Sequence, residues 1–353
     1  MSTVEEATFY IVCPPPPVTT TTTTTGGYVF ARYLTAPGYV DKISTSTMSL
    51  VKTFTAPSGH NRVFALTSLS GYVFVGYLTT PGHVDKISPS TMTLVKTFTA
   101  PSGHNLVTAL ISLSGYVFAG YRTYFGRVDK ISPSTMTLVK TFTAPRGHNY
   151  LTSLTSLSGY VFAGYSTRPG RVDKISPSTM SLVKTYNAPS GHIIVHALTA
   201  LSGYVFVGQL FTGFYRSPGY VDKISPSTMS LVKTFTPPSG HNFVYSLTSL
   251  SGYVFVGYNT SPGHIDKISP STMTLVKTFT APSRHNIVHA LTSLSGYLFA
   301  DYHTSPAVVT TFVGFQTGPA YVDKINPSTM SLVKTFTPPS GHNYVTALTI
   351  LAA

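Results

Sequence analysis

Seven histidines recur at one place in a repeated phrase, and they are the residues of this chain best suited to chemistry. Each closes a segment that reads APSGH or nearly so: His60, His104, His148, His192, His241, His285 and His342. Seven imidazoles could ring the mouth of a central channel. Because imidazole binds metals and titrates near neutral pH, such a ring could form a metal or anion site. Alternatively, each His and the Asn that usually follows hydrogen-bond a loop to the next structural unit. A seven-fold ring matches no ordinary metal geometry, and we therefore predict no metal.

The other ionisable residues argue against an enzyme. Glu5 and Glu6 are the only glutamates, and of the eight Asp only Asp301 lies outside a repeated Asp-Lys pair. The sequence contains no GxSxG, HExxH or Walker loop. Acid–base or calcium chemistry would have to use one repeated residue that has no distinguishing partner. We predict no cofactor and no catalysis, and an enzyme of lyase or lactonase type with a central site is the least favoured alternative.

Composition predicts an all-β protein. The 353 residues are 42% hydrophobic and only 9% charged, without Trp and with many Thr, Ser, Tyr, Gly and Pro. The net charge is +13, but fourteen of the cations are Lys in fixed places of the repeat, so nucleic acid is not an expected partner. Cys13 is the only cysteine, which excludes an intramolecular disulfide. No apolar run is long enough to span a membrane, and the acidic N-terminus does not resemble a signal peptide.

The Asp-Lys pair sets the period of the repeat. Its Asp residues are spaced 44, 44, 44, 49, 44 and 57 residues apart, which is the period of a four-stranded propeller blade. Turn residues divide one repeat into strands over 104–113, 116–121, 127–131 and 137–143, labelled A to D from the axis outward. The chain starts on a B strand at 26–30 and finishes on an A strand within 341–353. Residues 27–353 are therefore predicted to form a seven-bladed β-propeller, closed by the C-terminal strand.

One phrase of the repeat resembles a known family. Residues 84–98 read VDKISPSTMTLVKTF and resemble the YVTN family of propeller repeats, in which a V-x-V-I-D strand and a T-x-T hairpin lead into T-V-V-x-T-I. The segment YVFVGY stands where that family has its Y-V-x-N strand, whereas Asp-Lys is not typical of it. The resemblance covers nearly all of 27–353. It implies a seven-bladed propeller, often on secreted or surface proteins, and no common catalytic residue.

Several places depart from the repeat. The B–C loops at 209–219 and 302–320 are longer than the others and carry Phe211, Phe214, Phe312 and Phe315, which favours a contact role over simple loop growth. Arg32 and Asp301 replace a repeated Gly in blades that closure makes neighbours, so they could pair or be chance drift. Arg284 replaces the Gly before a repeated His, which predicts that this position does not need a positive φ. Asn259 begins an N-glycosylation sequon, although the Pro after it disfavours modification.

Residues 1–26 are an extension that the ring does not need. A β-prone piece over 7–12 is followed by a Pro/Thr-rich spacer over 14–25. The piece contains Phe9, Tyr10, Ile11 and Val12. The spacer ends in a run that could carry O-linked sugars: Thr19, Thr20, Thr21, Thr22, Thr23, Thr24 and Thr25. An apolar strand on such a spacer could pair with an outer strand of a neighbouring copy or of its own propeller.

We therefore expect an extracellular or cell-surface structural protein that assembles head to tail into a filament or array. In this hypothesis the N-terminal strand is donated to the next copy, and the long B–C loops form part of the contact. The alternative is a binding module that recognises a glycan or a protein on the face carrying the D–A and B–C loops. The absence of Trp argues against a lectin.

Overall fold

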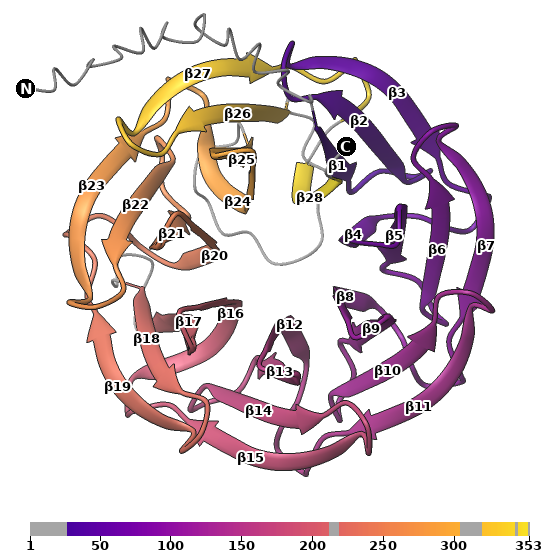
Figure 1. Ribbon diagram of the computed structural model, residues 1–353, viewed down its shortest axis with the longest axis horizontal. Helices are drawn as coiled ribbons and strands as arrows, with labels where there is room; N and C mark the ends of the chain where they lie inside the picture. The colour runs from indigo at the N-terminus through magenta and orange to yellow at the C-terminus, as the bar shows by residue number, and fades with distance from the viewer. Residues whose placement is uncertain (1–26, 212–218, 304–319, 343–344, 352–353) are drawn as a thin grey trace, which may run out of the picture.

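The computed structural model shows a closed ring of seven blades, each an antiparallel sheet of four strands (Figure 1). It describes residues 27–211, 219–303, 320–342 and 345–351. Blade 1 consists of β28, β1, β2 and β3, and blades 2 to 7 follow in chain order from β4 to β27. The C-terminal β28 pairs with β1, as the ends of the sequence predict. The chain is thus an all-β propeller with the predicted number of blades and the predicted closure.

The strands occupy equivalent positions in every blade. The innermost A strands are β28 (Val345–Leu351), β4 (Val63–Leu69), β8 (Val107–Leu113), β12 (Leu151–Leu157), β16 (His192–Leu201), β20 (Val244–Leu250) and β24 (Asn286–Leu294). The B strands are β1 (Tyr28–Tyr33), β5 (Tyr72–Tyr77), β9 (Tyr116–Tyr121), β13 (Tyr160–Tyr165), β17 (Tyr204–Phe211), β21 (Tyr253–Tyr258) and β25 (Tyr297–His303).

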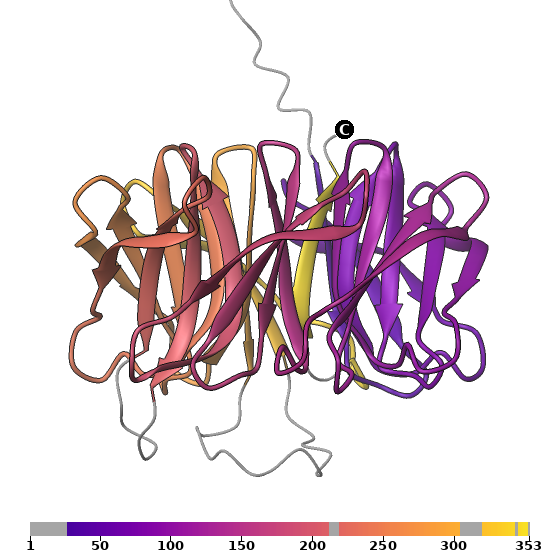
Figure 2. The same ribbon diagram turned by 90° about the horizontal axis from the view of Figure 1, so that it is seen from below.

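The C strands are β2 (Tyr39–Ser44), β6 (His83–Ser88), β10 (Arg127–Ser132), β14 (Arg171–Ser176), β18 (Tyr220–Ser225), β22 (His264–Ser269) and β26 (Ala320–Asn326). The outermost D strands are β3 (Ser49–Thr55), β7 (Thr93–Thr99), β11 (Thr137–Thr143), β15 (Ser181–Asn187), β19 (Ser230–Phe235), β23 (Thr274–Thr280) and β27 (Ser331–Phe336). Seen edge-on, the strands cross the thickness of the disc and the loops form its two faces (Figure 2). No helix that could cross a membrane occurs among the described residues.

The core lies between blades rather than inside any one of them. Alternate residues of a strand point to opposite faces of its sheet, and both faces of a B strand are covered by neighbouring blades. On β1, Val29 belongs to a cluster shared with blade 7, whereas Phe30 belongs to a cluster shared with blade 2. This double burial explains why the B strands read as continuous apolar runs. The apolar cluster between blades 7 and 1 contains the same kinds of strand residues as the clusters at the other interfaces.

Most inner strands begin later than the sequence predicts, whereas β16 begins at His192 and β24 at Asn286. Strand A of blade 3 starts at Val107 instead of residue 104, because His104 turns toward another strand and Leu106 has a φ of 59°. Most B strands contain a Gly directly before their last Tyr, and the surroundings of Gly76 explain why. A Cβ there would lie 2.5 Å from Cγ1 of Val107 in the next blade. Arg32 stands at this crowded position in blade 1.

One sequence expectation about the D–A loop is wrong. Arg284 replaces Gly, yet its φ is 71°, in the left-handed region where the equivalent Gly59 has 85°. The loop geometry is imposed by hydrogen bonds on both sides, including the one from the His285 amide to the Pro282 carbonyl. Arg284 therefore adopts a backbone conformation that costs a side-chain-bearing residue free energy.

We predict that Arg284→Gly stabilises the propeller by about 1 kcal/mol, because Gly adopts a positive φ without steric cost. The matched control is Gly59→Ala in blade 2, which creates the same conflict and should destabilise by a similar amount. Urea denaturation of both variants measures the difference in unfolding free energy. A destabilised Arg284→Gly would mean that the Arg side chain stabilises more than its backbone conformation costs.

Candidate functional site

The seven repeated histidines contact seven buried carboxylates. In every blade the imidazole Nδ1 lies 2.9 Å from Oδ2 of an Asp that is fully buried. The pairs are His60–Asp85, His104–Asp129, His148–Asp173, His192–Asp222, His241–Asp266, His285–Asp323 and His342–Asp41. Each Asp lies on a C strand, which is the third strand from the axis. The imidazoles therefore lie beside the C strands and do not ring the channel mouth. No group of three or more His, Cys, Asp or Glu side chains that could hold a metal occurs in the described part of the chain.

Each carboxylate also accepts a hydrogen bond from a Thr of the D strand, and in blades 1, 2 and 6 it accepts another from the Tyr of the B strand. The second oxygen of Asp85 accepts a hydrogen bond from the Thr97 hydroxyl of the D strand at 2.6 Å. The Tyr77 hydroxyl of the B strand donates to the oxygen that faces His60, at 2.8 Å. Burial raises the pKa of Tyr77 well above its usual value, and the charge of Asp85 raises it further. The network thus joins the incoming loop to strands B, C and D, and both carboxylate oxygens are occupied.

The Lys of the Asp-Lys pair contacts the following blade, whereas the Asp binds the loop that arrives from the preceding blade. Neighbouring residues of a strand point to opposite faces of the sheet, so Lys86 points toward the next blade. Its ammonium donates to the Pro133 carbonyl in the C–D turn of that blade at 2.9 Å, and lies 3.8 Å from the centre of the Tyr72 ring. Lys324 makes the equivalent bond to the Thr45 carbonyl and so joins blade 7 to blade 1. The two residues of the pair therefore connect each blade to both of its neighbours.

Blade 5 departs from this scheme and compensates. Gln209 stands where other B strands end in Tyr, and its side chain is fully buried. The missing phenol is supplied by blade 4, where Tyr186 replaces the Phe that usually ends the D strand. Its hydroxyl donates to Oδ2 of Asp222 at 2.8 Å, the bond that Tyr77 makes to Asp85. Two substitutions 23 residues apart in the sequence thus preserve one hydrogen bond.

A double-mutant cycle tests this compensation. Tyr186→Phe should destabilise by about 1 to 3 kcal/mol, because Asp222 loses a donor in a buried site. Gln209→Tyr should also destabilise, because its hydroxyl would compete with Tyr186 for the same oxygen. The double variant restores the arrangement of blade 2 and should lie within about 1 kcal/mol of the wild type. Additive losses in urea denaturation would show that the two positions are independent. Tyr77→Phe is the control for the loss of one phenol.

Two buried charges lie on the two blades that closure makes neighbours. Arg32 and Asp301 are 2% and 0% exposed, on β1 and β25 of neighbouring blades. Burial lowers the pKa of Arg32 and raises that of Asp301, and each charge opposes the effect of burial on the other. The Arg32 guanidinium also donates to the Val63 carbonyl and lies 4.4 Å from the centre of the Phe64 ring. The two departures that the sequence singled out are thus coupled electrostatically.

One position of the inner strands carries chemistry that the sequence analysis missed. It lies two residues after a residue with a positive φ near the start of the inner strand. Blades 3 and 4 have Thr108 and Thr152 there, whereas blades 5, 6 and 7 have His196, Tyr245 and His289. The two Thr hydroxyls donate to a carbonyl of the next inner strand, Leu151 or Val195. The three rings instead contact one another, with centroids 5.0 Å apart for His196 and Tyr245 and 5.1 Å apart for Tyr245 and His289. We call these three rings the aromatic arc.

Burial and positive charge shape the electrostatics of the aromatic arc. Burial lowers the pKa of His196 to about 4, and the charge of Arg122 lowers it in the same direction. Arg122 follows the B strand of blade 3, whereas His196 lies in blade 5, so blade 4 stands between the two residues in the ring. Burial raises the pKa of Tyr245, and a hydrogen bond from the Asn259 side chain opposes that rise. At neutral pH the arc therefore presents a neutral imidazole and a neutral phenol near a cation.

These residues could have been found by comparing repeats position by position. His196 and His289 do not belong to the repeated loop motif, and Tyr245 replaces Thr in an otherwise similar strand. Only the closed ring shows that the three departures are adjacent, because they lie 49 and 44 residues apart in the sequence. Asn259, predicted as a glycosylation site, is 6% exposed and lies at the arc, whereas a glycan needs an exposed amide.

The depressed pKa of His196 predicts a pH dependence. The unfolded chain protonates this residue near its usual pKa of 6.5, whereas the folded chain keeps it neutral down to about 4. The contribution to stability is therefore complete above pH 6.5 and is lost as the pH falls toward 4. Urea denaturation at a series of pH values measures this effect. Between about pH 7 and about pH 4.5, the unfolding free energy of His196→Thr should fall by less than that of the wild type. Tyr245→Thr, which removes no group that titrates in this range, is the control and should keep the wild-type slope.

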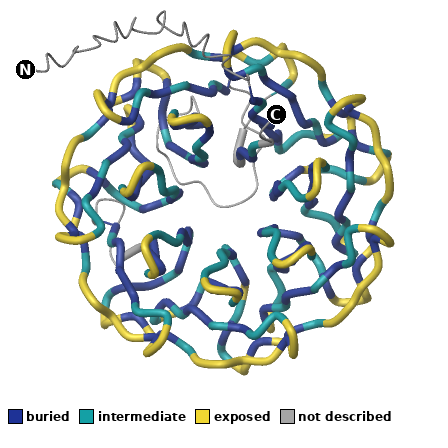
Figure 3. The backbone as a smooth tube through the Cα atoms, in the orientation of Figure 1, coloured by how far each residue is buried: buried dark blue, intermediate teal, exposed yellow. Residues whose placement is uncertain are grey.

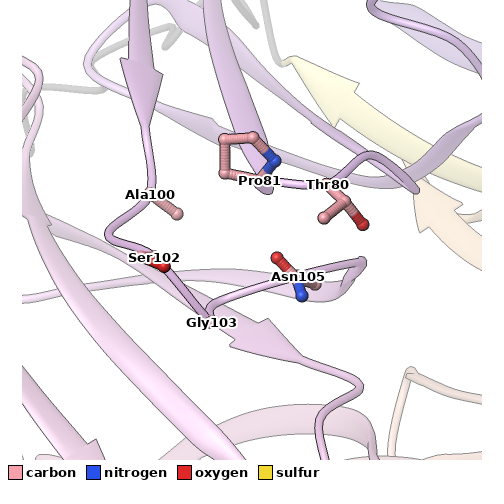
Figure 4. A pocket seen from close by; sticks show the side chains of 6 residues that line it. All are labelled: Thr80, Pro81, Ala100, Ser102, Gly103 and Asn105. Carbon is pink, nitrogen blue, oxygen red and sulfur yellow. The ribbon is translucent and has the colours of Figure 1, made fainter.

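A shallow pocket lies on the same face between blades 2 and 3 (Figure 4). Thr80, Pro81, Ala100, Ser102, Gly103 and Asn105 line it. Its polar side chains are the Thr80 hydroxyl of the B–C loop and the Ser102 hydroxyl and Asn105 amide of the D–A loop. None of the lining residues is charged or titratable. The pocket offers less to a specific ligand than the aromatic arc does.

The outer D strands form the second candidate surface. Each D strand pairs with one neighbour only and is the outer edge of its sheet. Every D strand exposes a Leu by 37 to 40% and the following Val by 48 to 49%, beginning with Leu50 and Val51 in blade 1. Exposed residues concentrate on this outer ring and on the turns (Figure 3). The residues predicted to contact it, Phe9 to Val12, Phe214, Phe312 and Phe315, lie outside the described residues, as do Thr19 to Thr25 and the side chain of Phe211.

Comparison with known proteins supports the fold alone. No family model matches the chain, and no curated protein sequence matches it. The computationally designed Ika8 protein matches with a TM-score of 0.60 and 14% identity, covering 92% of this chain and 90% of that one. The WD40 β-propeller domain of Doa1 matches with a TM-score of 0.60 and 13% identity, covering 78% and 82%. The class of this protein is therefore a β-propeller built from tandem repeats.

Proposed function

We propose that this protein is an extracellular structural protein that assembles head to tail through its outer strands. The observation that carries the proposal is the ring of exposed Leu and Val pairs on seven strand edges. An edge strand presents unpaired backbone groups that can bond to another strand, and apolar side chains beside them gain from being covered. Leu50 and Val51 point to opposite faces of the sheet, so an added strand would cover part of both.

The N-terminal extension of a second copy is the occupant that fits this edge. Its residues 7–12 read ATFYIV and have high β propensity. Glu5 and Glu6, the only glutamates of the chain, directly precede this piece. The outer strands carry an exposed Lys after each Val, such as Lys52 after Val51. Lys on an edge opposes unspecific pairing, so an acidic strand is favoured over a neutral one.

Such a contact would produce a chain of molecules. A strand given by one copy and received by the next joins two different surfaces. Repeating that contact builds an open filament, unless the rotation between successive copies happens to close them into a ring. The long B–C loops at 209–219 and 302–320 distinguish blades 5 and 7 from the rest, and would select among seven nearly equal edges. Near-identical blades suit a structural role, in which every copy of the repeat has the same packing task. The resemblance to YVTN repeats favours the cell surface as its location.

Deleting residues 1–13 should abolish assembly while leaving the propeller folded. Light scattering and negative-stain electron microscopy would show polymers for the full chain and single discs for the truncated one. The charge-reversal variant Glu5→Lys/Glu6→Lys should weaken assembly at low salt, since it removes the attraction to the outer Lys residues. Replacing Thr20 and Thr21 by Ser is the matched control in the spacer and should assemble normally. Single discs from the full chain would overturn the proposal.

Ligand binding on the face of the D–A and B–C loops is the second candidate function. The aromatic arc favours it, because the large side chains of blades 5 to 7 replace Thr residues that join the inner strands of blades 3 and 4. In blade 6 the Ser246 hydroxyl donates to the Val288 carbonyl and keeps the bond between inner strands, so the ring of Tyr245 is not needed for that bond and is better explained by a ligand.

A further inference from the structure

The aromatic arc has the geometry of one wall of a binding site. Its rings belong to three adjacent inner strands, β16, β20 and β24, and all are partly exposed near the loop face. Strands β16 and β24 contain 10 and 9 residues, whereas β20 between them contains 7. In blade 5 the pairing of strands A and B extends to His192 and Phe211. In blade 7 it extends to Asn286 and His303. These two hairpins extend past the shorter hairpin of blade 6, and Tyr245 lies between them.

A buried polar atom at this place lacks a partner. Asn259 directly follows the B strand of blade 6 and is only 6% exposed. Its side chain bonds to Tyr245, yet its Oδ1 has no hydrogen-bond partner among the described residues. A buried carbonyl oxygen without a donor is costly, so this atom would accept a bond from a hydroxyl or an N–H group of a ligand. At this position the other blades have Leu34, Leu78, Arg122, Ser166, Leu210 and His303.

Charge at the site favours an anion. Seven of the eight Asp are engaged with His and Thr in the interior of the blades, and the eighth, Asp301, is buried near Arg32. No acidic side chain is therefore exposed among the described residues, while Arg122 is close enough to lower the pKa of His196. The whole chain carries +13, which draws anions toward its surface.

We propose that the aromatic arc binds an acidic sugar, with Arg122 facing the carboxylate and Asn259 accepting from a ring hydroxyl. Tyr245 and the two imidazoles are inclined to one another by 42° and 72°, so they offer separate polarisable faces and edges to a sugar ring. His196, neutral at working pH, exchanges a hydrogen bond with a second hydroxyl. This inference rests on the second proposed function, ligand binding, and is independent of assembly. It names a ligand class and a site that do not involve the repeated His–Asp pairs.

Isothermal titration calorimetry of the full chain with glucuronate, a short uronate oligosaccharide and glucose tests the inference. The variants take residues that other blades already carry at the same position: Tyr245→Thr as in blade 3, Asn259→Leu and Arg122→Leu as in blade 2. We expect glucuronate to bind and each variant to weaken it by about tenfold or more. Glucose should bind more weakly than glucuronate, and only the Arg122→Leu variant should remove that preference. Tighter binding of the oligosaccharide would identify a polymer as the natural source.

Phe64→Thr is the control, because it changes the same strand position in blade 2, where the ring packs near Arg32 and outside the arc. It should leave the affinity unchanged. Circular dichroism melting verifies that every variant is folded. If glucuronate binds and the three variants have no effect, ligand binding stands and the site is wrong. If neither acidic probe binds the folded wild type, the inference of an acidic sugar is overturned. Binding of glucose alone would overturn the role of Arg122.

Discussion

The buried carboxylate on each C strand is the interaction on which the ring depends. A charged group inside a protein is destabilising unless hydrogen bonds replace its water. Here the replacement comes from three directions: the His of the incoming loop, the Thr of the D strand and, in several blades, the Tyr of the B strand. None of these donors can move without leaving the carboxylate unsatisfied. The position of the loop relative to its blade is thereby fixed, and so is the angle between successive blades.

The neighbouring Lys extends this local order around the ring. Because adjacent residues of a strand face opposite sides, one dipeptide both anchors the loop behind it and reaches the turn of the blade ahead. A closed ring accumulates any error in the angle between blades, so an identical connector in every copy is the simplest way to close it. This requirement explains the near-identity of the repeats without invoking seven functional sites.

The same requirement makes departures from the repeat informative. At Tyr186 and Gln209 two changes cancel, and the hydrogen bond to the carboxylate survives. At Arg32 and Asp301 two charges occupy the crowded Gly position on either side of the seam. At the aromatic arc, by contrast, rings that contact their neighbours stand where blades 3 and 4 have Thr, and in blade 6 the Ser246 hydroxyl makes the bond to the next inner strand, at the Val288 carbonyl. Departures of the first two kinds preserve the ring, whereas the third kind adds something that the ring does not need.

The strands, the number of blades and the closure could be predicted from the sequence alone, because each of these depends on local signals. Ser-Gly turns, Pro in the C–D loop and the alternation of strand residues are read within a few positions, and the C-terminal strand lacks a partner unless it joins blade 1. The sequence could not assign the partner of each His, the phenol that Tyr186 supplies to Asp222, or the adjacency of His196, Tyr245 and His289. These contacts join residues tens of positions apart, and which pairs meet is decided by the angle between blades. The sequence also predicted that the backbone at Arg284 does not need a positive φ. The hydrogen-bonded loop imposes a positive φ there, whichever residue occupies the position.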